Sequence, residues 1–556
     1  MAAVVVCLLT TPALVQQVGS LGVVSGSVYN GATGSTISGA TVTLGPHYER
    51  GSTRRAVADE KGRFEIRSVL PGRYSVMAEA TRFVADSDFG SQRYVDVAPG
   101  EAVRGLRLPL VSAAVLTGVV TDDQNDPVPG VGVAALEHTA IAGRMQVGMM
   151  VRGRTDDRGA YRLSGLRPGR YLVAIPHKVL TSGTRPTGLP TIFYPGVSSS
   201  VAASAVVVEP GQEHGGINIR IPEPKGLHTL AGTMLGSPAG LKYAVRLIPS
   251  ESGDAPIELE VREAVTTPAG AFSFPETPPG HYLVRAVAFP TSGRPEGARG
   301  PTVTLPSVLG PTPPEPTFWG ETSLTVDERG APSIGVQARE GVRISGRLVF
   351  EGSTTVPSLI EEPRMFVVVT PTDKQDIGYV PVARVEADGR FKTAGLPPGQ
   401  YELFPWIVST KWRQWTLKSV GVGSREVGGG AVEVDTSPLP EVVIVLTDRP
   451  TELSGLVLGS DGKPEAGVNV YAFASDPRLR RLLTWSPSRF VITRTDDSGA
   501  FAVKGLLPGD YLLAAVRAGS SVGWASEESL RKLALQATKV ALSPGDRRVV
   551  NLKGIK

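Results

Sequence analysis

The sequence predicts an all-β protein, a tandem array of five small antiparallel β-sandwich modules with one short helix in the last. Three observations lead to this prediction. The chain has 556 residues, too many for a single hydrophobic core. Its 65 glycines and 46 prolines, beside 41% apolar residues, suit short strands joined by many turns. One hairpin motif also occurs five times along the chain.

A constant spacing defines the repeated hairpin. Each copy has a glycine two positions before an aromatic residue, and a Pro-Gly-x-Tyr sequence places its tyrosine ten residues after that aromatic residue. The glycine, aromatic residue and tyrosine of the five copies are Gly62, Phe64 and Tyr74; Gly159, Tyr161 and Tyr171; Gly270, Phe272 and Tyr282; Gly389, Phe391 and Tyr401; and Gly499, Phe501 and Tyr511. Because the spacing never changes, we predict one rigid element in each module.

The residues around the motif predict a turn, a strand, a second turn and another strand. Sequences such as 156–159 and 496–499 combine Asp, which can bond to the backbone ahead of it, with Gly, which is free to take a positive φ. Residues alternate between apolar and polar in the strand that follows, so its aromatic residue should face the core. The Pro-Gly turn then leads into a strand that begins at the tyrosine.

Further recurring signals set the predicted boundaries. Every module opens with an apolar residue, a small residue and a glycine, as in Val24-Ser25-Gly26, and most close with a Pro-Gly turn followed by alternating residues. This gives about seven short strands per module, as in a small sandwich. The predicted segments are a signal peptide at 1–20 and modules 1 to 5 at 21–112, 113–224, 225–340, 341–450 and 451–556.

The one helix is predicted at 526–538, in module 5. Ser526 can cap it, the acidic Glu527 lies in its first turn, and Leu530 and Leu533 share one face. We expect this helix to pack across an open end of the last sandwich and to cap the array.

The first residues indicate export. Ala2 to Val15 is apolar but too short to span a bilayer, and polar Gln16 and Gln17 follow it, as in a secretory signal, although no Lys or Arg precedes it. Cys7 is the only cysteine, so a processed chain would use neither disulfides nor thiolate metal sites. We therefore expect an extracytoplasmic protein, periplasmic, cell-surface or secreted, with no transmembrane segment in the mature chain.

These motifs together resemble the carboxypeptidase regulatory-like domain. The shared features are the opening Gly-x-Val, Pro-x-x-Gly-Val-x-Val at 127–133 and 464–470, Thr-Asp-x-x-Gly-x-aromatic, and Leu-x-Pro-Gly-x-Tyr. The resemblance implies a transthyretin-like (prealbumin-like) β-sandwich, also grouped with carbohydrate-binding-like folds. It is strongest in modules 2 and 5 and weakest in modules 3 and 4, where 267–270 lacks the turn acid and 356–363 replaces the Pro-x-x-Gly step. Tandem arrays of this kind resemble secreted bacterial proteins.

No catalytic, metal or cofactor site follows from the sequence, and we predict that the protein is not an enzyme. None of the six histidines begins a metal-ligand pair; they are His47, His138, His177, His214, His228 and His281. Gly519-Ser520-Ser521-Val522-Gly523 has the letters of a nucleophile elbow, but no histidine follows it to act as base. The acid pairs at 122–123, 156–157 and 496–497 fit turn positions better than a calcium or acid–base site. An enzyme with an unrecognised site is the least favoured alternative.

Ligand contacts, if any, are expected in the variable loops, because binding residues concentrate on loops of a rigid scaffold. The candidate aromatic residues are Phe193, Tyr194, Phe318, Trp319, Trp412, Trp415 and Trp524. They would stack on a sugar or anchor a partner, or they would simply close an end of the sandwich. In Lys411-Trp412-Arg413-Gln414-Trp415, charges and rings alternate; inward-facing rings there would defeat the hypothesis.

The first functional hypothesis is a noncatalytic, exported, multi-module binding or structural protein, an elongated monomer at the cell surface or in the periplasm. The alternative is carbohydrate binding through the aromatic loops of modules 3 to 5, with polysaccharide or a cell-surface protein as the partner. Nucleic acid is excluded as a partner, because the net charge of +4 is spread along the chain without a basic run.

Overall fold

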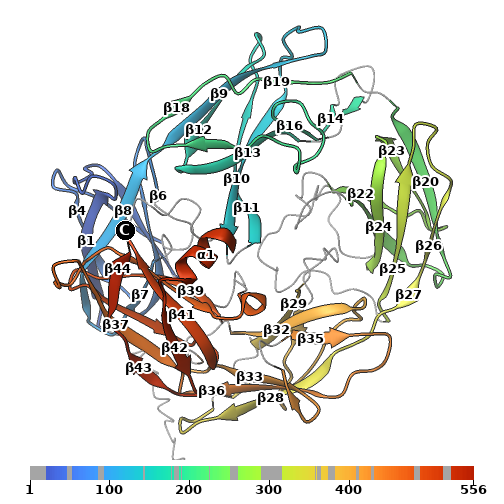
Figure 1. Ribbon diagram of the computed structural model, residues 1–556. Coiled ribbons are helices and arrows are strands. Elements are labelled where there is room, and N and C mark those ends of the chain that lie inside the picture. The colour runs from blue at the N-terminus through green and yellow to red at the C-terminus, as the bar shows by residue number, and fades with distance from the viewer. Residues whose placement is uncertain are drawn as a thin grey trace, which may run out of the picture. The chain divides into compact units, whose positions relative to one another are not determined.

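The protein is described by a computed structural model. It describes residues 20–46, 53–85, 93–141, 144–176, 178–180, 187–189, 191–223, 226–250, 261–289, 316–356, 358–359, 365–372, 382–407, 412, 414–427, 431–480, 489–517 and 527–555. Figure 1 shows strands from the first to the last described residues, with the short helix α1 near the C-terminus. Modules 1 to 5 are the segments predicted at 21–112, 113–224, 225–340, 341–450 and 451–556.

Module 1 has two sheets whose inward side chains form its core. One has the order β4-β1-β8-β6 (Arg63–Val69, Gly22–Asn30, Ala102–Ser112, Phe83–Ala85), and the other β3-β2-β5-β7 (Arg54–Val57, Thr41–Pro46, Gly72–Glu79, Arg93–Val97). Alternate residues of β1 and β2 are fully buried, among them Val24, Val28, Val42 and Leu44. This period of two follows from the pleat, which turns successive side chains to opposite faces.

Module 2 repeats this arrangement. One sheet has the order β12-β9-β18 (Ala160–Leu166, Ala114–Thr121, Glu213–His214), and β19 (Ile219–Arg220) also pairs with β9. The other has the order β11-β10-β13-β16 (Arg144–Arg154, Gly132–Ile141, Gly169–Ile175, Ile192–Phe193), and β17 (Val206–Val208) also pairs with β13. A separate pair is formed by β14 and β15 (Lys178–Leu180, Thr187–Leu189). Leu116 from one sheet and Val173 from the other belong to one buried cluster, so the two sheets form a sandwich.

Modules 3 and 4 also have two sheets each. In module 3 they are β23-β20-β26 (Ala271–Thr277, His228–Leu235, Ile334–Gln337) and β22-β21-β24-β25-β27 (Arg262–Val265, Lys242–Pro249, Gly280–Phe289, Phe318–Val326, Arg339–Glu340). In module 4 they are β31-β28-β36-β33-β34 (Arg390–Lys392, Ser345–Glu351, Val442–Thr447, Thr416–Val422, Arg425–Glu426) and β30-β29-β32-β35 (Val382–Arg384, Met365–Pro371, Gly399–Ile407, Ala431–Val434). Each module has a core cluster of its own.

In module 5 the strands that form two separate sheets in the other modules join into one eight-stranded sheet. Its order is β39-β38-β41-β44-β37-β40, with β42 on β41 and β43 on β37 (Phe490–Arg494, Asn469–Ala474, Gly509–Val516, Leu552–Ile555, Glu452–Leu458, Ala500–Lys504, Thr538–Leu542, Arg547–Val549). Strand β44 makes the connection, because it pairs parallel with both β37 and β41. A short 3₁₀ helix spans Pro477–Leu479 and α1 spans Glu527–Ala534.

One pairing pattern recurs in all five modules. The opening strand pairs antiparallel with the strand that carries the hairpin aromatic residue, as β1 does with β4. On its other side the opening strand pairs parallel with a closing strand, as β1 does with β8. The predicted all-β fold of tandem sandwich modules is confirmed, and these parallel pairs are a feature that the sequence did not reveal.

Segments of the same chain cover the outer sheet face in modules 2 and 5. In module 2, Val197, Ala203 and Ala205 pack against a buried cluster that includes Leu136 and Phe193. In module 5, Leu530 and Leu533 of α1 pack on the outer face of β38 and β41. The helix is therefore shorter than the predicted 526–538 and covers a sheet face rather than an open end, because Tyr471, Phe473 and Leu512 make that face apolar.

Candidate functional site

In the turn before each hairpin aromatic residue, a glycine and a polar side chain form hydrogen bonds that fix the backbone. The hairpin glycine donates to the carbonyl three residues earlier in every copy, and its φ lies between 70° and 83°. The Asp59, Asp156 and Asp496 carboxylates each accept two backbone N–H bonds ahead of them. Hydrogen bonds from Ser498 and the backbone hold the pKa of Asp496 below its usual range. These acids are therefore occupied in turns.

The tyrosine of each hairpin closes the corner that precedes it. Its hydroxyl donates to the carbonyl oxygen four residues earlier in all five modules: Tyr74 to Leu70 (2.9 Å), Tyr171 to Arg167 (3.0 Å), Tyr282 to Pro278 (2.9 Å), Tyr401 to Pro397 (2.8 Å) and Tyr511 to Leu507 (2.6 Å). All five rings are buried. Burial raises the pKa of Tyr511 to about 12. The sequence showed the tyrosine but not this bond, which satisfies the carbonyl at the corner.

The glycine of each opening strand lies directly opposite the hairpin aromatic residue. Gly26 pairs with Phe64 and Gly118 with Tyr161, and the other modules repeat the pairing. A Cβ atom at Gly118 would collide with the carbonyl of Ile217 in the closing segment, which also accepts the Tyr161 hydroxyl bond. Glycine is therefore required because ring and closing strand both approach the backbone closely.

A threonine ahead of the turn acid has a structural role that sequence reasoning missed. The Thr155 hydroxyl donates to Val128 O and accepts from Val131 N, both at 2.8 Å, and Thr495 repeats this with Glu465 and Val468. The hydroxyl thus ties the Pro-x-x-Gly loop to the hairpin. The recurrence of Thr-Asp in modules 2 and 5 was the signal that could have revealed it.

Module 2 buries an ion pair where the other modules are apolar. Glu137 lies opposite Tyr171 in the sheet, and its carboxylate lies 3.7 Å from the Arg167 guanidinium, with the two side chains only 10% and 11% exposed. Burial raises the pKa of Glu137 and lowers that of Arg167. The equivalent pairs in modules 1, 3, 4 and 5 are Pro46 and Leu70, Pro249 and Pro278, Pro371 and Pro397, and Ala474 and Leu507.

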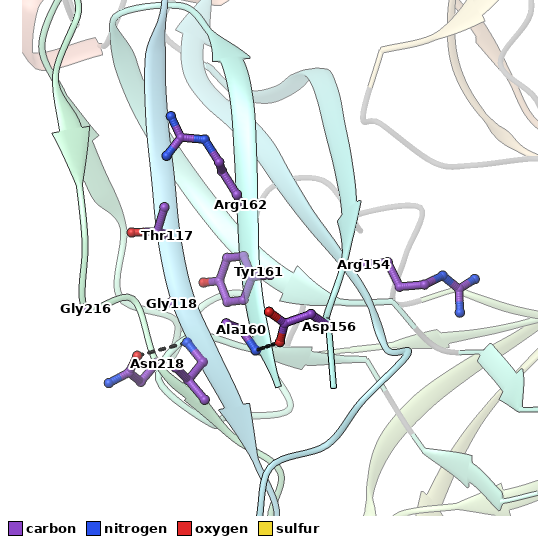
Figure 2. Close-up of a pocket in the computed structure, with 10 residues that line it drawn as sticks. Thr117, Gly118, Arg154, Asp156, Ala160, Tyr161, Arg162, Gly216 and Asn218 are labelled. Carbon is purple, nitrogen blue, oxygen red and sulfur yellow. Dashed lines mark hydrogen bonds between the residues drawn. The ribbon is translucent and has the colours of Figure 1, made fainter. Parts of the chain in front are cut away.

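A shallow pocket of about 620 Å³ lies on the outer face of β9 and β12 in module 2. It forms where the closing segment leaves the sheet between β18 and β19, so that Gly216 and Asn218 lie beside the exposed edge of β9. Figure 2 shows Thr117, Tyr161, Asp156 and Asn218 around it, with the Arg154 side chain extending away from them.

The polar groups of this pocket are engaged in holding the fold. Asn218 Oδ1 accepts the N–H of Val119 at 3.0 Å, and Asp156 Oδ1 accepts that of Ala160 at 2.8 Å. Arg162 forms an ion pair with Glu213, and Arg154 donates to Gly130 O. Asn551 makes the same bond to Leu456 N in module 5 at 3.0 Å. The pocket therefore lies outside the gap between the two short closing strands, a gap that module 5 also has. No nucleophilic side chain in its lining has a base beside it.

The structure corrects the expectation about the loop aromatics. Phe193 is 0% exposed, Trp319 7%, Trp412 1% and Trp415 3%, so these rings have no free face for a sugar. Trp412 and Trp415 belong to the core of module 4, where their centroids lie 5.4 and 5.2 Å from that of Phe350. Tyr194 and Phe318 are half-buried and pack against the cores of modules 2 and 3. These aromatics close the sandwiches.

Several expectations lie outside the described residues. They concern the signal peptide, Lys411, Arg413, Trp524, His47, His177 and the Gly519–Gly523 sequence. Within the residues that the structure describes, no three His, Cys, Asp or Glu side chains gather as metal ligands. No helix in the described part of the chain has the length and apolar character needed to cross a membrane.

Comparisons with known proteins support the resemblance in the sequence. No curated protein matches the chain. Solved structures similar to it include a streptococcal ancillary pilin (TM-score 0.18, 13% identity, 57% of this chain and 99% of that one) and the major pilin subunit of Bacillus cereus (0.16, 9%, 80% and 99%). Two B repeat units of the Staphylococcus aureus collagen-binding protein are also similar (0.14, 10%, 73% and 93%). The family model for the carboxypeptidase regulatory-like domain matches residues 23–110, which lie in module 1, whereas the motifs predicted the strongest resemblance in modules 2 and 5.

Proposed function

We propose that the chain is an exported, noncatalytic, multi-module protein that serves as a binding or structural scaffold outside the cytoplasm. One observation carries the proposal. The polar groups that recur from module to module form hydrogen bonds with the backbone. The turn acids, the hairpin tyrosine hydroxyls, and Thr155 and Thr495 all bond to main-chain groups of their own module. Repetition therefore preserves a fold rather than a reactive site.

The pocket in module 2 agrees with this assignment. Its carboxylate already accepts two backbone N–H bonds, and its tyrosine hydroxyl donates to Ile217. Both bonds to Asp156 go to the same carboxylate oxygen, Oδ1, and fix the side chain in the turn. The pocket therefore supports a structural role better than a catalytic one.

Export is tested by fractionating cells that produce the full chain and measuring the mass of the mature protein. We expect the protein in the extracytoplasmic fraction, with a new N-terminus close to residue 20. A control with charged residues introduced at Val5 and Leu8 should keep the protein in the cytoplasm, because the apolar segment of a signal does not tolerate charge. A full-length protein that stays in the cytoplasm would contradict the proposal.

The scaffold role is tested by sedimentation velocity and small-angle scattering on the purified full chain. We expect a monomer more elongated than a compact protein of its mass, since modules with separate cores pack little against one another in a spacer. The core substitution Trp412→Ala should unfold module 4 locally and change the scattering curve, whereas the exposed Val207→Ala should not. A compact particle would refute the spacer role.

A further inference from the structure

Strands β10 and β11 continue beyond the sandwich of module 2. Strand β13 pairs with β10 only from Ala134 to Glu137. The pairing between β10 and β11 then goes on for four more rungs, from His138 opposite Val147 to Ile141 opposite Arg144, after an irregularity between Leu136 and His138. Among the described strands, none pairs with either edge of this extension, which we call the ribbon (residues 138–141 and 144–147).

The other modules end this strand where module 2 continues it. In modules 1, 3 and 4 the strands equivalent to β10 end at Pro46, Pro249 and Pro371, and in module 5 β38 ends at Ala474, each directly opposite the hairpin tyrosine. Proline has no N–H to give to a ladder and stops pairing in the middle of a sheet. Module 2 has Glu137 at this position, so its ladder can extend. The ribbon is therefore a specific departure from the shared module.

An isolated two-stranded ribbon is marginally stable in water, and three or more strands are needed for lasting order. Strand β11 is also an edge strand of 11 residues, whereas the equivalent edge strands β3, β22, β30 and β39 have 4, 4, 3 and 5. A long open edge is a template for another strand. The ribbon thus lacks a third strand, and its open edge can pair with one.

The charge of the segment selects the third strand. Residues 138–154 contain Arg144, Arg152, Arg154 and one histidine, and no Asp or Glu. Arg154 donates to a main-chain carbonyl, which leaves its charge uncompensated by that bond. Arg144 is the first residue of β11, and Arg152 and Arg154 lie at its other end. A strand laid along β11 would therefore have cations near both of its ends, and complementary charge favours acidic side chains there.

We infer that the free edge of β11 binds an extended acidic segment of a partner protein as an added β-strand. Main-chain hydrogen bonds supply the binding, as in other cases of strand addition, and the arginines supply the preference for acid. This inference goes beyond the proposed scaffold role, since it assigns one module a partner-binding edge. An enzyme or a cytoplasmic protein with the same edge would bind the same segment, so the two proposals fail separately.

The test is amide hydrogen exchange on the full chain with three short capped peptides. One alternates Glu and Val, a second alternates Lys and Val, and a third is the acidic peptide with prolines in place of two valines. We expect the amides of 144–147 to exchange rapidly in the free protein and to slow at least about tenfold with the first peptide only. Arg144→Glu should abolish the protection, whereas Arg104→Glu, an exposed arginine of module 1, should leave it unchanged.

Each other outcome overturns the inference. Equal protection by the proline peptide would mean that charge attraction acts without strand pairing, and equal protection by the lysine peptide would remove the role of the arginines. No protection by any peptide, or ribbon amides already as slow as those of β13, would show that β11 needs no third strand. Protection that rises with protein concentration in the absence of peptide would assign the edge to a second copy of the chain.

Discussion

The buried pair of Glu137 and Arg167 can be replaced by residues that the chain itself uses elsewhere. Module 5 has Ala474 and Leu507 at the two equivalent positions, on either side of the same tyrosine corner. The double substitution Glu137→Ala with Arg167→Leu therefore copies a pair that already fits this fold. The two single substitutions each leave one charge behind in a site where both side chains are about one-tenth exposed.

The single and double substitutions should change the stability of module 2 differently. Removing one partner of a buried pair costs about 3 kcal/mol, at the low end of the usual range because 3.7 Å is longer than a hydrogen bond. The double substitution should be neutral or stabilise module 2 by about 1 kcal/mol, since it removes two desolvated charges. Burial raises the pKa of Glu137, so without Arg167 this carboxyl can neutralise itself by binding a proton. Arg167→Leu alone should thus cost less at pH 5 than at pH 8.

Hydrogen exchange of the β13 amides in the full chain measures the stability of module 2 in each variant. Denaturation of the full chain would not, because unfolding of a chain with several modules is not a two-state process. The single variants should exchange about a hundredfold faster than the wild type, and the double variant no faster. The matched control Ala474→Glu with Leu507→Arg places the charged pair in module 5 and should destabilise β41. If the double variant loses the sum of the two single losses, the two side chains do not interact and the reasoning is refuted.

Three further predictions concern the recurring elements. Gly455→Ala should cost about 3 kcal/mol, because its Cβ would collide with Val550 O, whereas Gly132→Ala, with nothing within 4 Å, should cost nothing measurable by hydrogen exchange of the strand amides in its own module. Burial raises the pKa of Tyr511 to about 12, above 10.0 in the unfolded chain, so its stabilisation is complete below pH 10 and is lost, by about 3 kcal/mol, as the pH rises through 12. Absorbance titration of wild type against Tyr511→Phe should place this ionisation near 12, and a value near 10 would contradict its burial. Trp412→Ala should cost about 4 kcal/mol, measured by hydrogen exchange of the module 4 strand amides, and retained protection would show that the ring is not in the core.

The sequence predicted those parts of the fold that local physics determines. A glycine after Asp-x-x predicts a turn, and alternating residues after it predict a half-buried strand; both hold at Asp156 and Asp496. Module 3 shows that the turn needs an acceptor rather than an acid, since Thr267 replaces the acid there and its hydroxyl still accepts the N–H of Ala271 at 3.1 Å. The turn keeps its glycine, its backbone bond and this side-chain bond.

Features that depend on distant residues were beyond the sequence. The opening glycines recur visibly, but their reason lies in a ring and a closing strand that approach from elsewhere in the module, as at Gly118. The loop tryptophans look like surface residues because charges surround them, yet Trp412 and Trp415 pack on Phe350, which is more than 60 residues earlier in the chain. Which face an irregular segment turns inward is decided by packing that no local pattern records.

The parallel pairing of opening and closing strands determines how a module bears tension. In module 1, β1 and β8 run side by side from Val23 opposite Ala102 to Asn30 opposite Leu110. A pull along the chain enters at the start of β1 and leaves at the end of β8, which are opposite ends of the paired stretch. The load therefore shears all the hydrogen bonds between the two strands at once instead of peeling them singly. The long parallel pairing of module 1 therefore opposes stretching along the direction in which the chain passes through it.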